Sequence, residues 1–179
     1  MKKVVLIVIL SVMNICLAQK KLLTRAGITT FEASVPAFEE VKAVNNATTV
    51  VVNADTGEIA CLNLIKGFRF KVALMEEHFN ENYIESDKYP KSIFKGKIEK
   101  FDMNNLTSTP REYLLTGKLE LHGKTNDVNI KAKISKNGTG VLLVSNFFIN
   151  ANDYNVAIPN LVKSKVSNKV NVNIQADLK

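Results

Sequence analysis

The sequence predicts an all-β protein, an antiparallel barrel or sandwich of about eight strands. From residue 92 onward, apolar and polar residues alternate almost without interruption, which is the two-residue period of strands with one buried face. Short segments rich in Asn and Gly separate these runs, and such segments are typical of tight turns. Because a closed barrel leaves no strand edge unpaired, it suits these long strands better than an open sheet.

The first 18 residues have the three-part layout of a secretory signal peptide. Two lysines precede the apolar run Val4–Val12, and Cys16 with Ala18 forms a small-x-small cleavage site. The run is shorter than the roughly 20 residues that a membrane span needs, and the bulky residue before Cys16 disfavours lipidation. We expect cleavage after Ala18, one mature domain over residues 19–179, and a periplasmic or secreted location in a bacterium.

The N-terminal half of the mature chain combines strand-like runs with polar connections. The run GITTFEASV alternates, with Thr29, Phe31 and Ala33 on one face, and it stops at Pro36. Two β-branched runs follow, joined by a tight turn at Thr56. In order, we predict a polar lead-in (19–27), a strand (27–35), a connector with one helical turn (37–47) and two strands (48–55 and 58–70).

One helical pattern, at residues 72–83, interrupts the strands. Its apolar residues recur at three- and four-residue spacing, which places them on one helix face. They are Val72, Met75, Phe79 and Tyr83. Pro90 ends the segment because it forces the preceding residue out of helical geometry.

The second half of the chain consists of alternating segments, which we predict as strands at 92–101, 112–123, 126–135, 139–150 and 165–178. Gly96 and Gly117 fall on the apolar faces of the first two of these strands. Small residues at those positions either leave room inside the barrel for a ligand or mark bends in the strands. The sequence leaves both alternatives open.

Two motifs resemble those of a known family. The first is His78-Phe79, followed by Tyr83, the run Asp87-Lys88-Tyr89-Pro90 and Phe94; the second is GKLELHGKT, from Gly117 to Thr125. In this order the chain is similar to the YceI-like family of lipid- and polyisoprenoid-binding proteins, over most of its mature length. Many members open with a tryptophan and a histidine-containing strand, and this chain has no tryptophan.

The resemblance implies an extended eight-stranded, antiparallel, lipocalin-like barrel with a short helix near one end. Its interior would hold an amphiphilic lipid, of polyisoprenoid or fatty-acyl type. The residues we expect to line the ligand are Met75, Phe79, Tyr83, Phe94, Ile98, Leu115, Leu119 and Leu121. Lys88, Lys91 or Lys95 could meet a charged head group. The same apolar residues would form the core of a filled barrel without a ligand.

Catalytic chemistry has little support in the sequence. The chain has two histidines, His78 and His122, in separate segments, and neither belongs to a metal-binding or nucleophile motif. A metal site combining them with Glu81 lacks the usual ligand spacing. His122 precedes a turn, where its ring could bond backbone groups, and the apolar flanks of Cys61 suggest a buried thiol. We predict no enzyme activity, no cofactor and no metal.

The net charge of +7 and the pI near 9.4 raise the question of anionic partners. The lysines are spread along the chain, and the phenylalanines occupy core-like positions instead of interleaving with basic clusters, so we predict no nucleic-acid binding. A diffuse basic surface could aid transient contact with an anionic membrane. The resulting prediction is an exported lipid carrier or sequestering protein; the alternative is a structural or stress-related interaction barrel with a filled interior.

Overall fold

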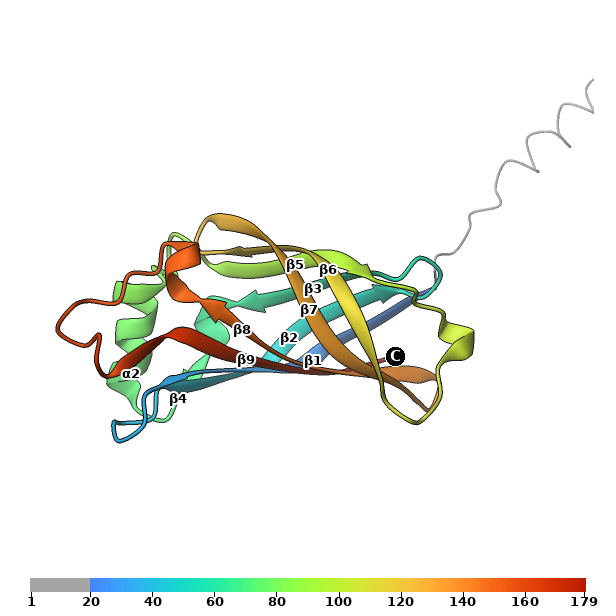
Figure 1. The fold of residues 1–179 in the computed structure, drawn as a ribbon, viewed down its shortest axis with the longest axis horizontal. Coiled ribbons are helices and arrows are strands. Elements are labelled where there is room, and N and C mark those ends of the chain that lie inside the picture. Colours follow the sequence, from blue (N-terminus) through green and yellow to red (C-terminus); the bar gives the residue numbers. More distant parts are fainter. Residues whose placement is uncertain (1–19) are drawn as a thin grey trace, which may run out of the picture.

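The computed structural model describes residues 20–179, which form a closed antiparallel barrel with a short helix at one end (Figure 1). The predicted signal peptide lies outside the described residues. The strands are β1 (Lys21–Ser34), β2 (Lys42–Asn53), β3 (Glu58–Leu64), β4 (Arg69–Phe70), β5 (Lys91–Ile98), β6 (Arg111–Leu121), β7 (Lys124–Asn137), β8 (Gly140–Asn150) and β9 (Val166–Leu178), and the helix is α2 (Ala73–His78).

Eight strands close the barrel in the order β1-β9-β8-β7-β6-β5-β3-β2, and an additional pairing of β1 with β2 joins the ends of the sheet. Every one of these pairings is antiparallel. The two-residue strand β4 extends the sheet beside the end of β2, where Phe70 lies opposite Ala43. The predicted eight-stranded barrel with a short helix is therefore confirmed.

The predicted boundaries of the first two strands were wrong. β1 begins at Lys21, so most of the expected lead-in is strand, and register shifts on both sides of Gly27 break its alternation. β2 begins at Lys42, inside the expected connector. There Asn45 is only 1% exposed, and its side-chain amide donates to the Leu64 carbonyl (2.9 Å). Because asparagine is typical of turns, this buried residue made the beginning of β2 look like a connector in the sequence.

The segment predicted as one strand over 58–70 is divided, because a 3₁₀ turn, Ile65–Gly67, separates β3 from β4. The predicted helix is divided as well: α2 passes into a π turn, Phe79–Tyr83. In a regular α-helix the main-chain N–H of residue 80 would bond to the Glu76 carbonyl. Here the Asn80 side-chain amide donates to that carbonyl (2.8 Å), and the Ile84 N–H donates to the Phe79 carbonyl (2.9 Å), which closes the wider turn.

The barrel interior has a filled half and a hollow half. The filled half lies at the end where residues 99–110 connect β5 with β6, away from α2 (Figure 1). Its core includes the fully buried side chains of Ile98, Ile134 and Leu178, and Leu106 from the connecting segment packs into the same cluster. The hollow half lies under α2.

A glycine pair marks the boundary between the halves. Gly96 of β5 lies directly opposite Gly117 of β6. A Cβ atom on Gly96 would lie 2.3 Å from the Thr116 carbonyl oxygen and 2.8 Å from the ring of Phe94. The small residues therefore let the two strands approach closely and admit the Phe94 ring. They do not leave open space for a ligand, which was one of the two alternatives.

Candidate functional site

The hollow half contains a cavity of about 500 Å³, and its wall is almost entirely apolar. This volume lies within the 300–1,000 Å³ range of small-molecule sites. Side chains from the barrel wall form its floor, including Phe94, Leu115, Ile130 and Leu143. Residues of α2 and of the π turn lie over its mouth. The interior is thus open at one end, unlike the wholly filled barrel considered as the alternative.

Seven of the eight predicted ligand-lining residues lie in the cavity wall: Met75, Phe79, Tyr83, Phe94, Leu115, Leu119 and Leu121. Ile98, the eighth, lies outside it. Ile98 shares the inward face of β5 with Phe94, but it lies beyond Gly96 and packs in the filled half. Ligand contact by the other seven residues stays a prediction.

Four phenylalanines form a cluster at the mouth. The Phe79 ring centroid lies 5.2 Å from that of Phe31, 5.2 Å from that of Phe70 and 6.1 Å from that of Phe68. These separations are typical of favourable aromatic pairs. The cluster holds the π turn against β1 and β4. Sequence reasoning selected only Phe79, although Phe31 stood on the same face of its strand as Thr29 and Ala33.

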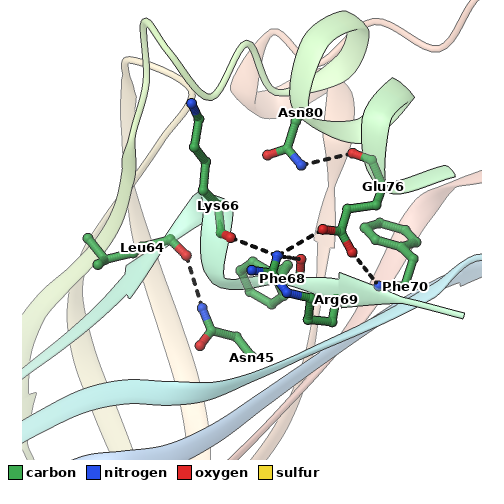
Figure 2. A network of polar contacts seen from close by, with 8 residues as sticks. All are labelled: Asn45, Leu64, Lys66, Phe68, Arg69, Phe70, Glu76 and Asn80. Carbon is green, nitrogen blue, oxygen red and sulfur yellow. Dashed lines mark hydrogen bonds and ion pairs between the residues drawn. The ribbon is translucent and has the colours of Figure 1, made fainter. Parts of the chain in front are cut away.

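A polar latch holds α2 on the barrel, and Figure 2 shows it. One carboxylate oxygen of Glu76 lies 2.8 Å from Arg69 Nη1, and the other accepts a hydrogen bond from the Phe70 N–H (3.1 Å). The Arg69 guanidinium also donates to the carbonyls of Lys66 (2.9 Å) and Phe68 (3.2 Å). Glu76 is not one of the apolar residues on the predicted helix face, and the sequence gave no sign of this role.

The deep wall of the cavity carries a few polar groups among its apolar side chains. Thr29, Asn63 and Ser145 line the cavity and are buried. Cys61, on the same face of β3 as Asn63, also lines the cavity, and burial raises the pKa of its thiol to about 12. The thiol is therefore protonated at neutral pH, which fits the expectation of a buried small residue and makes it a poor nucleophile. Among residues 20–179, the charged or titratable side chains that line the cavity lie near its mouth: Glu39 and Lys165 in the mouth loops, and His78 in α2.

The sequence profile of the YceI-like domain matches residues 18–178. The chain belongs to the YceI-like family. Among curated proteins, no sequence matches it.

Solved structures share the fold of this YceI-like barrel. A polyisoprenoid-binding domain from Saccharophagus degradans, implicated in plant cell wall breakdown, superimposes with a TM-score of 0.75 at 13% identity, covering 89% of this chain and 97% of that one. BcnA from Burkholderia cenocepacia superimposes with a TM-score of 0.68 at 16% identity, covering 85% of this chain and 96% of BcnA. The Campylobacter jejuni YceI protein superimposes with a TM-score of 0.54 at 18% identity, covering 74% of this chain and 81% of that protein.

The histidine of the second YceI-like motif joins three segments. His122 Nδ1 donates to the Tyr154 carbonyl (3.1 Å), and Nε2 lies 2.9 Å from a carboxylate oxygen of Glu85. The Tyr89 ring packs edge-on against the imidazole, with centroids 4.5 Å apart. The ring thus bonds a backbone group, as expected, and ties the turn after β6 to the segment that follows the π turn. His122 does not line the cavity, whereas His78 does.

The lysines expected to meet a head group lie elsewhere. Lys88, Lys91 and Lys95 are exposed and do not line the cavity of this YceI-like barrel. The Lys88 ammonium lies over the Tyr89 ring, and a hydrogen bond to Tyr89 and the charge of Glu85 raise its pKa. Lys165, in the segment before β9, lines the cavity and was not selected from the sequence.

Over residues 20–179, no three His, Cys, Asp or Glu side chains gather as ligands for a metal ion would. Within the same part of the chain, no helix has the length and apolar character needed to cross a membrane.

Proposed function

We propose that this chain binds one amphiphilic lipid, of polyisoprenoid or fatty-acyl type, with its apolar chain inside the barrel. The cavity of about 500 Å³, apolar and closed at its floor, is the observation that supports this most directly. The Saccharophagus degradans neighbour is described as polyisoprenoid-binding, which points in the same direction. Each CH₂ group that leaves water for such a cavity contributes about 0.8 kcal/mol.

The proposed action is non-enzymatic carriage or sequestration. The protein desolvates the chain, and a charged head group stays at the mouth, where water and Lys165 are in reach. Two observations favour binding over chemistry. The His122 ring faces Glu85 and a backbone carbonyl instead of the cavity, and the Cys61 thiol stays protonated at neutral pH.

Export is part of the proposal, because residues 1–18 have the layout of a signal peptide. We expect the mature protein to begin at Gln19, in the periplasm or outside the cell. Intact-mass measurement of the protein from a periplasmic fraction tests this. A mass that includes the first 18 residues would contradict it.

Transient contact with a membrane surface is the proposed route by which lipid enters and leaves. The loops at 35–41 and 155–165 and helix α2 lie at the same end of the barrel (Figure 1). They expose apolar side chains there: Leu161 is 90% exposed, Leu74 57% and Phe38 47%. Cleavage after Ala18 removes Lys2 and Lys3 and leaves 22 basic against 17 acidic residues, a net charge of +5, so the mature protein would also be attracted to anionic lipid.

Sedimentation with anionic vesicles tests the membrane contact. We expect the combined change Leu74→Asn and Leu161→Asn to reduce the bound fraction. Leu114→Asn, at an exposed apolar residue on the outer wall of β6, should leave it unchanged. Equal binding by all three proteins would argue against a docking role for the mouth.

Native mass spectrometry of the purified protein tests lipid binding itself. We expect a co-purified or added lipid, a prenyl alcohol or a fatty acid, to form a one-to-one complex. Leu119→Trp places an indole in the cavity and should abolish the complex, because it occupies the volume that the chain needs. Leu114→Trp is the matched control, since it adds the same side chain to the outer face of the same strand.

The alternative of an interaction barrel without a ligand predicts a different result. Wild-type protein would then be isolated empty and would ignore both prenyl lipids and fatty acids. That outcome would reject lipid binding whatever the two tryptophan variants show.

A further inference from the structure

Three neighbouring strands carry a chain of hydrogen bonds at the cavity wall. The Thr48 hydroxyl donates to Asn63 Oδ1 (2.7 Å). Because a hydroxyl has one hydrogen, the contact between the Thr29 and Thr48 hydroxyls (2.8 Å) must be donated by Thr29. The chain therefore runs from β1 through β2 to β3 and ends on the amide oxygen of Asn63.

The Asn63 amide nitrogen is left without an acceptor. Asn63 is 6% exposed and lines the cavity, and within residues 20–179 no hydrogen bond from its Nδ2 is found. The atom is also not among the fully enclosed unpaired polar atoms of that part of the chain, so it is accessible from the cavity. Buried Asn45 offers the contrast, since both its amide nitrogen and its amide oxygen have partners within the fold.

Buried polar groups are normally hydrogen-bonded, so an oriented donor in an apolar wall calls for an acceptor from outside the chain. The acceptor must be neutral, because the deep wall offers no cation and an unpaired buried anion is costly. Ser92 lies opposite Asn63 in the pairing of β3 with β5, and it adds a hydroxyl to the same part of the wall. The site thus suits a carbonyl oxygen on an otherwise apolar chain.

We propose that Asn63 Nδ2 donates a hydrogen bond to an uncharged carbonyl oxygen of the bound lipid, inside the cavity and below the phenylalanine cluster. This inference rests on the proposed lipid binding and narrows the ligand class to chains with a neutral carbonyl, such as an ester, amide or ketone. Anionic groups of the same molecule stay at the mouth.

The test compares two probes of similar length, methyl dodecanoate and tetradecane, by displacement of a fluorescent apolar dye. The readout is the ratio of their dissociation constants. We expect Asn63→Leu to shift this ratio against the ester by roughly fivefold, the value of one neutral hydrogen bond. Ser145→Ala is the control, because the Ser145 hydroxyl lines the cavity but already donates to the Lys131 carbonyl (2.7 Å).

Infrared spectroscopy of the ¹³C-labelled ester gives a second readout that needs only the wild-type protein. We expect the bound carbonyl band at the lower frequency of a hydrogen-bonded ester, and a return to the free-carbonyl frequency in Asn63→Leu. A free-carbonyl band in the wild type overturns the inference even where Asn63→Leu does not fold. If both probes bind and Asn63→Leu leaves the ratio of their dissociation constants unchanged, the Asn63 hydrogen bond is overturned while lipid binding stands. If neither probe binds the wild type, the proposed function fails as well.

Discussion

The two halves of the barrel use the same strands for different purposes. In the filled half, inward positions carry large aliphatic side chains such as Ile98, Ile134 and Leu178, and residues 102–110 cover the end. In the hollow half the inward face includes small or polar residues such as Ala33 and Ser145, and a latched helix covers the mouth. The contrast indicates that one half of the barrel stabilises the fold and leaves the other half free to remain empty.

Paired truncations measure this division most directly. Ile134→Ala should lower the free energy of unfolding by about 3 kcal/mol, because it opens a new cavity among fully packed side chains. Leu119→Ala should lower the free energy of unfolding by about 1–2 kcal/mol. The Leu119 side chain already borders the cavity, so the loss is limited to the free energy of transferring the removed carbon atoms out of water. Urea unfolding at neutral pH provides both values. Equal losses would show that the halves do not differ in packing.

The boundary between the halves should tolerate no added atom. A Cβ at residue 117 would lie 2.3 Å from the Lys95 carbonyl oxygen and 2.6 Å from the Cα of Gly96. We expect Gly117→Ala to destabilise the fold by about 2–3 kcal/mol, since β5 and β6 must separate to admit the methyl group. Lys118→Ala, at the exposed neighbouring residue, should change stability by less than about 0.5 kcal/mol in the same urea titration.

Alkaline unfolding tests whether water reaches the hollow half. The Cys61 thiol has a pKa of about 12 in the folded protein, against an ordinary value of 9.0. Above pH 9 the unfolded chain therefore loses the thiol proton while the folded protein retains it, so stability falls as the pH rises. By pH 10.5 this loss should reach about 2 kcal/mol.

Cys61→Val provides the matched comparison, because it removes the thiol and keeps an apolar side chain of similar size. The difference between wild type and variant in urea unfolding should grow between pH 9 and pH 10.5. A constant difference over that range would mean that the thiol is solvated and that the cavity is wet.

The latch should affect the mouth more than the whole fold. Arg69→Met removes the ion pair with Glu76 and keeps the aliphatic stem of residue 69. Because the guanidinium is largely exposed, we expect a loss of less than about 1 kcal/mol in global stability. Hydrogen exchange at residues 73–83 should accelerate roughly fivefold, which reports local opening. Lys131→Met breaks an ion pair with Glu112 on the barrel wall and should leave that exchange unchanged.

The strands of the second half were predictable because their alternation is continuous. The N-terminal parts of the first two strands were not predicted, and the reason is local. In β1, register shifts around Gly27 interrupt the alternation of inward and outward residues. In β2, Asn45 and Thr48 are buried, so polar residues stand where alternation requires apolar ones. Long-range hydrogen bonds offset the cost of burying these groups, and no single segment of sequence reveals such bonds.

Part of the candidate site was predictable for the same reason. A two-residue period shows which face of a strand is inward, so the sequence predicted Phe94, Leu115 and Leu119 on the inward face, and these residues line the cavity. The period carries no information on depth along the barrel, and Ile98 was therefore assigned to the cavity although it lies in the filled half. Asn63 was overlooked because its role depends on two threonines from other strands.

The single open end also limits how a lipid could be transferred from a donor to an acceptor. With one end filled, the proposed function requires that a lipid enter and leave by the same opening under α2. Whatever gives up the lipid and whatever receives it must therefore use the same face of the protein, one after the other. If the protein carries lipid as proposed, delivery works by alternate encounters, without a complex of all three partners. An excess of empty donor should then slow delivery by competing with the acceptor.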